Sequence, residues 1–349
     1  MVRYGRDRAA QMTVSVVIPH RDRADLLERV LSCLSHQCLP GETSLEVIVV
    51  DNGSSDASAE VAAAHGARSI LLGSNQGVSK ALNRGIEAAS GAWIAVLNND
   101  VDLAPDWLAV MLEAGQSADA WFVTGKVYDT GRAGVLDGAG DAVCRGGTAW
   151  RLGHGKRDGP EYSRPRATYF PSATAALFRR EFFDVAGLFD ESFFAYLEDV
   201  DLGMRAAALG LAGTYVPDAL AWHRGSETAG RWSSQSVAWI TRHQLLLIAK
   251  HYSEALLLRF ALPVLSAQLL WAALALSRGR FRAWLAGMLL GMRDCHAHWR
   301  PSSRRGEEGL AAALRAGEGE IAALQLAGGW DSYWRWYFRL VGQPVRRVP

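Results

Sequence analysis

The sequence predicts an α/β fold in which a mostly parallel sheet is flanked by helices, with a helical extension at the C-terminus. In the first hundred residues, short continuous apolar runs alternate with stretches of helical periodicity. Continuous apolar strands separated by helices are typical of parallel sheets covered on both faces. The chain has 349 residues, of which 49% are hydrophobic, so it is long enough to bury a large core. We expect strands at Val14–Ile18, Leu45–Val50, Ser69–Leu72 and Trp93–Leu97, and helices at Arg23–His36, Asp56–His65 and Gly77–Ala89.

Beyond these elements the pattern changes twice. Between Trp121 and Arg224 it is less regular, and the glycine-rich segment Gly131–Gly159 predicts a long loop or meander of the kind that often carries function. After about Trp232 the chain becomes helical. We therefore divide it into an α/β domain at 13–232, a hydrophobic and basic helical region at 233–300, and an aromatic-rich tail at 301–349. Ser236–Tyr252 is expected to be helical, and the apolar or aromatic stretches that follow are Ala255–Leu276, Trp284–Met292 and Gly329–Phe338.

Charge and cysteine usage narrow the class of protein. The formal net charge of +1 gives the chain no electrostatic reason to bind nucleic acid. Charge is nevertheless concentrated at Arg278–Arg305, where seven arginines and one aspartate form a basic patch of net charge +6. The four cysteines show no CxxC spacing, and the N-terminus lacks the apolar stretch of a signal peptide. We expect a protein that remains in the reducing cytoplasm.

Ligands of parallel α/β sheets bind at the carboxyl ends of the strands, so the residues that follow each strand are the first candidates. Asp51 follows a buried strand and is succeeded by small residues. A carboxylate at this place can accept the N3–H of uracil or thymine. The alternative is that Asp51 caps the following helix.

The sequence Asn98-Asn99-Asp100 ends the next strand but one along the chain. A hard cation such as Mg²⁺ or Mn²⁺ binds through one or two carboxylates together with the phosphate oxygens of a substrate, and Asp100 suits such a site. Asp102 is close enough in sequence to assist. The alternative is a simple turn, because Asn and Asp favour turns.

Three acids lie within four residues at Glu198, Asp199 and Asp201, after an aromatic approach that includes Phe193 and Phe194. An apolar wall raises the pKa of a neighbouring carboxyl group into the range of a general base. The alternative, that acids at a helix N-terminus offset the helix dipole, accounts for Asp201 better than for the other two.

A lone histidine, His223, follows Trp222. Such a histidine is more often structural, but imidazole binds Mn²⁺-like ions where a carboxylate shares the site.

Taken in order, these segments resemble the family 2 glycosyltransferases of GT-A fold from about Val14 to Arg224. Within that family, the chain is most similar to bacterial rhamnosyltransferases of cell-surface polysaccharide assembly, which share the Leu-Asn-x-Asp form and a hydrophobic C-terminal extension. The matching segments are Val16–Pro19, Val49–Asp56, Asn75–Gly77, Asn83–Gly85, Leu97–Asp100, Arg179-Arg180, Gly187–Glu191 with Phe194, Glu198–Asp201 and Trp222-His223.

The resemblance implies a role for each matching residue. Asp199 would be the catalytic base with Glu198 beside it, and Asp100 and His223 would hold a divalent metal, Mg²⁺ or Mn²⁺. Asp51 would bind the pyrimidine base in a pocket shaped by Pro19, and Asn98 would lie near the ribose. The full set of expected donor-binding residues is Pro19, Asp51, Asn75, Gly77, Lys80, Asn83, Asn98 and Asn99.

Two positions depart from the family pattern. Asn98 replaces an aspartate, which removes one negative charge from the metal site. Leu82 stands where many relatives have an arginine that reaches the diphosphate, and Lys80 is a candidate substitute.

The implied activity is an inverting, metal-dependent transfer of a sugar, rhamnose for preference, from a dTDP- or UDP-linked donor to a saccharide or lipid-linked acceptor. A catalytically inactive nucleotide-sugar-binding protein of the same fold is the alternative. A Rossmann oxidoreductase would need GxGxxG after the first strand, where Pro19-His20-Arg21 stands instead, and a P-loop NTPase would need GxxxxGK[ST], which does not occur.

The C-terminal third predicts peripheral attachment to the inner face of the cell membrane. Ala255–Leu276 and Trp284–Met292 are apolar and lie beside or within the basic patch, a combination typical of interfacial elements. A full span is disfavoured because Arg259 and Pro263 interrupt a stretch of 22 residues. The alternative is that these helices pack on the α/β domain as ordinary core, and the aromatic tail is open to either interpretation.

Overall fold

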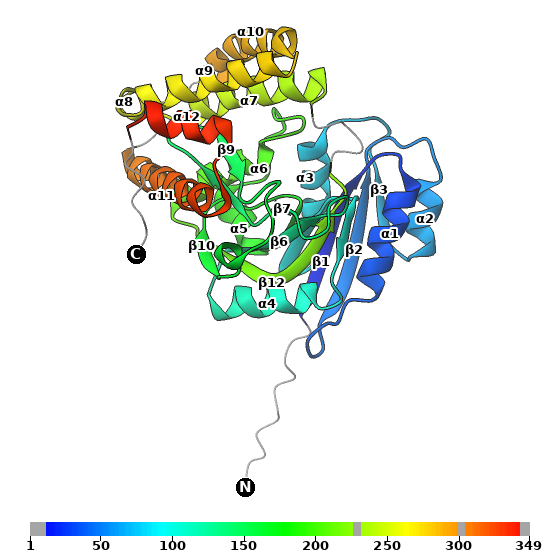
Figure 1. Ribbon diagram of the computed structural model, residues 1–349. Coiled ribbons are helices and arrows are strands. Elements are labelled where there is room, and N and C mark those ends of the chain that lie inside the picture. The colour runs from blue at the N-terminus through cyan, green and yellow to red at the C-terminus, as the bar shows by residue number, and fades with distance from the viewer. Residues whose placement is uncertain (1–11, 226–231, 299–303, 343–349) are drawn as a thin grey trace.

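The computed structural model describes residues 12–225, 232–298 and 304–342 (Figure 1). Arg300 of the basic patch lies outside these residues, and the side chains of Arg304 and Arg305 are likewise not described. The strands are β1 (Thr13–His20), β2 (Ser44–Asp51), β3 (Arg68–Leu71), β4 (Trp93–Leu97), β5 (Val101–Leu103), β6 (Phe122–Asp129), β7 (Leu136–Gly138), β8 (Asp141–Val143), β9 (Ala149–Arg151), β10 (Arg166–Thr168), β11 (Ala175–Arg179) and β12 (Gly213–His223). The helices are α1 (Ala24–Ser35), α2 (Ser58–Ala64), α3 (Val78–Ala88), α4 (Trp107–Ser117), the 3₁₀ turn η1 (Pro160–Tyr162), α5 (Arg180–Ala186), α6 (Glu198–Leu209), α7 (Ser234–His251), α8 (Glu254–Arg259), α9 (Ala261–Ser277), α10 (Phe281–His298), α11 (Arg304–Gly328) and α12 (Ser332–Leu340).

The main sheet is mixed, with strand order β10-β12-β6-β11-β4-β1-β2-β3. The pairs β1–β2, β2–β3, β1–β4 and β6–β12 are parallel, whereas β11 runs antiparallel to both β4 and β6. The predicted α/β class is confirmed, and so are all seven predicted elements of the first hundred residues, within a few residues at each end. The carboxyl ends of β1, β2, β3 and β4 therefore meet at one edge of the sheet.

The buried apolar strands explain this half of the fold. Val16, Ile18 and Ala95 face one core cluster with α1 and α4, while Val17, Ile48 and Val96 face another with α3 and α5. Residues that alternate along one strand thus contact helices on opposite faces of the sheet, as expected for strands that are apolar on both sides.

The glycine-rich segment forms the predicted meander. β7 pairs antiparallel with β6, and β8 and β9 form a separate two-stranded hairpin. Gly138 is required where the meander turns back on itself, because a Cβ atom there would lie 2.4 Å from Cγ of Arg151. The meander thereby carries Asp137, Asp141 and Arg151 toward the end of β12.

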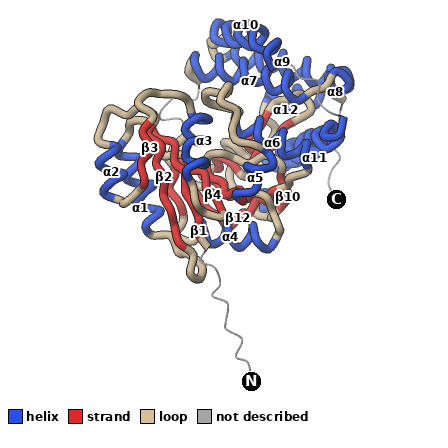
Figure 2. Tube along the Cα trace, turned by 180° about the vertical axis from the view of Figure 1, so that it is seen from behind, coloured by secondary structure: helices blue, strands red, loops and turns tan. Residues whose placement is uncertain are grey.

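All the described residues after Ser233 that have regular structure are helical. α7 and α10 pack closely, and α10 forms the outermost layer of this part of the molecule (Figure 1). Seen from behind, these helices again lie far from α1 and α2 (Figure 2). Close packing of α10 on α7 depends on Gly287 and Gly291, where a Cβ atom would lie 2.4 Å from the Ala238 carbonyl oxygen and 2.6 Å from Leu245.

The apolar stretch Ala255–Leu276 is divided into α8 and α9 at Phe260. Pro263 explains the break, because its ring is incompatible with the carbonyl group of the residue four positions earlier but is tolerated in the first turn of a helix. Within the described part of the chain, no helix combines the length and hydropathy needed to cross a membrane.

The aromatic tail packs on the protein. Trp334, Tyr337 and Phe338 of α12 are buried, and the hydroxyl of Tyr337 donates a hydrogen bond to Glu318 of α11 (2.8 Å). Trp336 is about half exposed. One face of α12 is therefore part of the core, which agrees with one of the two interpretations that the sequence leaves open.

Candidate active site

The carboxyl ends of β1 and β2 place His20 and Asp51 side by side in register. The Asp51 carboxylate is largely buried and accepts the backbone N–H of Ser54 (2.7 Å). Asp51 does not cap α2, which begins seven residues later, at Ser58. The carboxylate of Asp56 instead accepts the N–H of Ser58 (3.2 Å). The helix-cap alternative for Asp51 is therefore wrong, although the turn bond to Ser54 is structural.

Asn52 ties the β2 edge to the loop before α3. Its side-chain oxygen accepts the N–H of Gln76 (2.7 Å), and its side-chain nitrogen donates to the carbonyl of Gly77 (3.0 Å). Asn75 is exposed on this loop, and its side chain accepts the N–H of Gly77 (3.1 Å). Lys80 follows in the first turn of α3 and is half-buried.

The α3 N-terminus is also joined to the segment that precedes α6. Gly77 has φ 91°, and a Cβ atom there would lie 2.7 Å from the carbonyl oxygen of Phe194. That oxygen accepts the N–H of Val78 (2.7 Å). Asn83, which the resemblance assigns to donor binding, is buried and exchanges two hydrogen bonds with the backbone of Phe189 (both 2.9 Å). In this structure Asn83 therefore anchors the chain before the acidic motif.

His20 was not among the predicted site residues. Its Nε2 atom contacts the Ser58 hydroxyl (2.7 Å), and its Nδ1 atom accepts a hydrogen bond from the Asn99 side chain (2.9 Å). Burial lowers the pKa of His20, so its ring is neutral at physiological pH. The imidazole thus links the β1 edge to Asn99. Asn98, beside it, is held through its backbone N–H by the carbonyl of Thr174 (3.0 Å).

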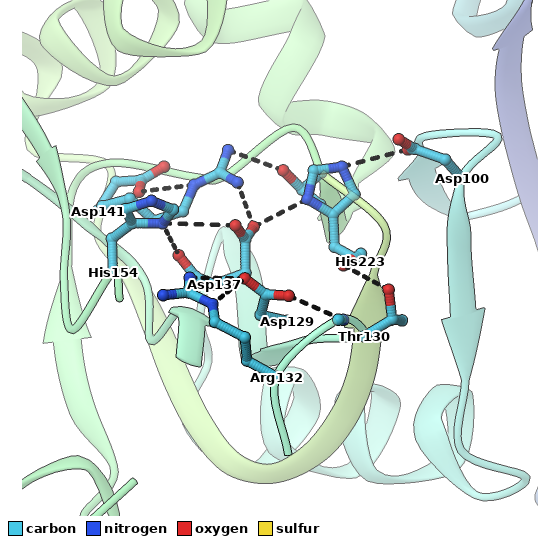
Figure 3. Close-up of polar contacts among 11 residues, drawn as sticks. Asp100, Asp129, Thr130, Arg132, Asp137, Asp141, His154 and His223 are labelled. Atoms are coloured by element: carbon cyan, nitrogen blue, oxygen red, sulfur yellow. Dashed lines mark hydrogen bonds and ion pairs between the residues drawn. The ribbon is translucent and has the colours of Figure 1, made fainter. Parts of the chain in front are cut away.

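Asp100 and His223 meet at the ends of neighbouring strands, as the resemblance implies for the metal site. Nε2 of His223 lies 3.2 Å from Oδ1 of Asp100, and Nδ1 lies 2.8 Å from Oδ2 of Asp137 (Figure 3). All three side chains are largely buried. Burial opposes a charge on the imidazole, but hydrogen bonds with the two carboxylates outweigh it and raise the pKa of His223 to about 9.

The donor atoms of Asp100 and His223 fit a divalent cation. Bonds of about 2.1 Å at right angles place adjacent ligand atoms about 3 Å apart, close to the observed 3.2 Å. Asp137 occupies the position of a carboxylate that accepts the second ring N–H of a metal-bound histidine. No group of three or more His, Cys, Asp or Glu side chains with metal-binding geometry occurs among the described residues. A pair of protein ligands is nevertheless the usual mode for an ion that also binds substrate phosphates.

Arg151 of β9 connects this site to the acidic motif. Its guanidinium donates to Asp137 (2.5 Å) and to the Thr174 hydroxyl (2.9 Å), and it lies 3.9 Å from Asp141. Burial and the charge of Asp199 raise the pKa of Asp141 to about 7, although Arg151 opposes the shift. The Arg151 guanidinium therefore reduces the repulsion within a cluster of carboxylates.

Glu198 and Asp199 begin α6 and differ in their hydrogen bonds. Asp199 accepts two backbone N–H groups, from Ala173 (3.2 Å) and Val200 (2.9 Å), which favour its ionised form. Oε2 of Glu198 is buried and has no hydrogen-bond partner among the described residues. Burial and the charge of Asp199 raise the pKa of Glu198 to about 8, and burial also raises that of Asp199. Of the two carboxyl groups, Glu198 is therefore the one that holds a proton, which leaves Asp199 as the stronger candidate for a base.

Asp137, Asp141 and Arg151 were missed by sequence reasoning because they lie in an irregular, glycine-rich segment. The signal that could have found them is the presence of two acids and an arginine among small residues in a segment already expected to be functional. Asp102, which was considered as an assistant to Asp100, is instead paired with Arg29 (2.7 Å) and Arg224 (3.3 Å).

Comparisons with known proteins agree on one family. The sequence model of Glycosyl transferase family 2 matches residues 15–187. The N-acetylglucosaminyl-diphospho-decaprenol L-rhamnosyltransferase of Mycobacterium tuberculosis is 30% identical over 251 residues, which cover 65% of this chain and 81% of that protein.

Two solved structures share the fold. One is the mannosyltransferase of Pyrobaculum calidifontis in complex with GDP-Man and Mn²⁺, with a TM-score of 0.51 and 18% identity over 95% of this chain and 85% of that one. The other is GalNAc-T7 with UDP, GalNAc and Mn²⁺, with a TM-score of 0.58 and 15% identity over 84% of this chain and 59% of that one. At these identities the likeness establishes the fold, a mixed, mostly parallel GT-A-like sheet flanked by helices.

Proposed function

The chain belongs to glycosyl transferase family 2, and from that premise we propose that it is an inverting, metal-dependent enzyme that transfers a sugar from a nucleoside diphosphate to an acceptor hydroxyl. The observation that carries the proposal is the network of contacts that joins Asp100 and His223, through Asp137 and Arg151, to Thr174. The neighbour of Thr174, Ala173, donates its backbone N–H to Asp199. This network supports a site for a leaving diphosphate and a site for a base that are connected by direct contacts.

The proposed reaction is a single displacement. Asp199 accepts the proton of the acceptor hydroxyl while the oxygen of that hydroxyl bonds to the anomeric carbon. The bond from this carbon to the diphosphate breaks, and its electron pair leaves on the phosphate oxygen. A divalent cation bound by Asp100 and His223 would neutralise the charge of that leaving group. Because the base and the leaving group stand on opposite sides of the anomeric carbon, the product has inverted configuration.

We propose dTDP-rhamnose as the donor, with UDP-sugars as the next candidates. The name of the mycobacterial relative supports a rhamnosyl donor and an acceptor linked to a polyprenyl diphosphate. Asp51, at the end of β2, would accept the N3–H of a pyrimidine ring. In this proposal the base lies against Pro19. The ribose and diphosphate lie near Asn98, Asn99, Asn75, Gly77 and Lys80.

We also propose that the enzyme docks on the cytoplasmic face of the membrane through α9 and α10. α9 contains no charged residue, yet Leu262, Leu265, Leu269 and Leu276 are 54–62% exposed. Leu285, Leu289 and Met292 form a similar exposed stripe on α10. A helix that is apolar all round is normally buried, so this exposed face needs a partner.

The arginines around this face favour a lipid partner. Arg278, just after α9, and Arg282 and Arg293 of α10 are exposed, and they would meet anionic headgroups. Each such residue near the surface contributes about 1 kcal/mol of attraction. Docking of this kind would bring the site to a lipid-linked acceptor.

A donor screen tests the proposed activity. Full-length protein is incubated with dTDP-rhamnose, UDP-sugars or GDP-mannose and with polyprenyl-diphosphate-linked N-acetylglucosamine, and release of the nucleoside diphosphate is measured. We expect turnover with a pyrimidine donor that EDTA abolishes and Mn²⁺ or Mg²⁺ restores, with inversion seen by NMR of the product. Binding of the nucleotide sugar without turnover would instead support the inactive binding protein, and activity in excess chelator would refute the metal.

A further inference from the structure

The segment from Asp190 to Leu197 reaches the acidic motif in a conformation that it does not hold by itself. Tyr196 and Leu197 are consecutive non-glycine residues with φ of 70° and 67°. Non-glycine residues in this left-handed region are strained and persist there only where their surroundings fix them. Leu197 directly precedes Glu198 and Asp199, so the backbone of the acidic motif depends on whatever holds these two residues.

Side chains of helix α7 supply that support by contacting backbone carbonyl groups of the segment. Nδ1 of His243 lies 2.8 Å from the carbonyl oxygen of Tyr196, and Nη1 of Arg242 donates to the carbonyl oxygen of Ser192 (2.9 Å). Because a carbonyl oxygen accepts only, Nδ1 of His243 carries the hydrogen. His243 is fully buried, and burial lowers its pKa to about 4, so the ring is neutral and the contact persists at any pH at which the enzyme would be assayed.

Aromatic contacts add to the same interface. The ring of Phe193 lies 4.8 Å from that of His243, centroid to centroid. Trp239, one turn earlier on α7, contacts Phe194 (5.2 Å) and Tyr196 (6.3 Å). One face of α7 is therefore directed at the chain that precedes the acidic motif.

The end of α7 holds the first turn of α6. Nζ of Lys250 lies 2.5 Å from carboxylate oxygens of both Asp190 and Asp201, and Nε2 of His251 lies 2.8 Å from Asp201. Asp201 is fully buried, two residues beyond Asp199, and also contacts Arg205 (3.1 Å). These partners hold the pKa of Asp201 well below its usual range, so the cluster is charged and fully paired.

The outer helices reinforce α7 in turn. Asp294 of α10 contacts Arg242 (2.7 Å), and Gly287 and Gly291 allow α10 to approach the α7 backbone closely. The contacts therefore run without interruption from α10 through α7 to Tyr196 and Asp201.

We infer that α7 is the positioning element of the general base and that His243 is its principal positioning residue. The C-terminal helices therefore belong to the catalytic unit. The inference rests on the proposed function in one respect, the role of Asp199 as the base. The inference does not require α7 to contact the donor, because Pro19 and Asp51, the residues proposed to bind the nucleotide base, belong to β1 and β2.

Substitutions of His243 test this inference in the full-length enzyme. His243→Phe keeps the ring that packs on Phe193 but removes the N–H donor, whereas His243→Asn keeps a donor near the Nδ1 position. We expect kcat to fall at least tenfold in His243→Phe, with the KM for the donor and the Kd for the nucleoside diphosphate within about twofold of wild type. His243→Asn should recover most of kcat.

Thr241→Val is the matched control. Thr241 is equally buried on α7 but faces α9, where its hydroxyl accepts a hydrogen bond from Trp271 (2.8 Å). The substitution removes a buried polar group that does not contact the acidic segment. It should therefore lower thermal stability and leave kcat within about twofold of wild type. A fall in kcat of the same size in Thr241→Val would show a general effect of destabilising α7 and would overturn the positioning role of His243.

Hydrogen exchange gives a readout that does not depend on transferase activity. Backbone amides of residues 190–201 should exchange at least tenfold faster in His243→Phe than in wild type. Their exchange rates should be unchanged in Thr241→Val. Unchanged exchange in His243→Phe would overturn the inference even if the enzyme is active. If the wild-type protein showed no turnover but residues 190–201 still exchanged faster in His243→Phe, the support of this segment by His243 would be upheld. That result would refute the proposed function alone.

Discussion

Nδ1 of His223 lies 2.8 Å from Oδ2 of Asp137, and this contact determines which ring nitrogen faces Asp100. A metal binds only neutral imidazole, so a bound ion would displace the Nε2 proton that the two carboxylates favour. With Nδ1–H donated to Asp137, the lone pair of Nε2 would then face the ion. Asp137 therefore matters to the proposed metal site although it does not face the proposed ion.

Asp137→Asn is expected to weaken metal binding at least tenfold, because partners of this kind typically contribute 10–100-fold to metal affinity. The measurement is calorimetric titration of Mn²⁺ into the protein saturated with dTDP. Asp102→Asn is the control, since Asp102 is nearby in sequence but paired with Arg29 and Arg224. Equal Mn²⁺ affinity in the two variants would contradict the role of Asp137.

Asp199→Asn is expected to lower kcat at least a hundredfold, in line with the contribution of a general base. The side chain keeps its size, so the affinity for the donor should stay near normal. Glu198→Gln should lower kcat less, because the raised pKa of Glu198 keeps this carboxyl group protonated, and Gln is similarly neutral. If Asp199→Asn retained most of kcat and Glu198→Gln did not, the base would be Glu198.

Glu198→Gln is also expected to change how stability depends on pH. In the folded protein the pKa of Glu198 is about 8, above its ordinary value of 4.5, so the folded state holds this proton longer than the unfolded state. Stability from this group is present below about pH 4.5 and is lost as pH rises to about 8. The free energy of unfolding of Glu198→Gln relative to wild type should therefore rise by roughly 2 kcal/mol or more between pH 5 and pH 9. Urea denaturation at the two pH values measures it, and a constant difference would mean that Glu198 is ionised throughout.

Local pattern was enough to predict the elements of the first hundred residues, because the strands Val14–Ile18 and Trp93–Leu97 are apolar on both faces and the helices between them are amphipathic. It was not enough to predict the antiparallel strand β11, whose partners β4 and β6 are distant in sequence. The same limit applies to the site. Asp100 and His223 were found because they follow strands in a family pattern, whereas Arg151 reaches Asp137 only through the folding of the meander.

Asp51→Ala is expected to weaken both UDP and dTDP about tenfold, since a hydrogen bond to a charged group contributes roughly 1.5–3 kcal/mol. Affinity for GDP should change less, which narrows the preference for pyrimidines. Isothermal titration with the three nucleotides measures this, with Asp25→Asn on the exposed start of α1 as the control. Equal losses for all three nucleotides would restrict Asp51 to its turn bond with Ser54.

The proposed membrane face can be tested without disturbing α7. Leu265→Glu with Leu269→Glu places two charges on the exposed face of α9, where both side chains already lie in solvent, so the fold should be retained. Each leucine buried in a bilayer contributes about 1.5–3 kcal/mol, and the double variant should therefore lower binding to anionic phospholipid vesicles at least tenfold. Leu71→Glu on β3, at a side chain that is also largely exposed, is the matched control and should bind as wild type does.

High salt should release part of the wild-type protein from the vesicles, because the arginines contribute electrostatically. Transfer to a water-soluble acceptor should be unchanged in the double variant, since α7 and the acidic segment are intact. Vesicle binding that survives both glutamates would contradict the lipid surface, and failure of the wild type to bind any vesicle would leave the face to a protein partner.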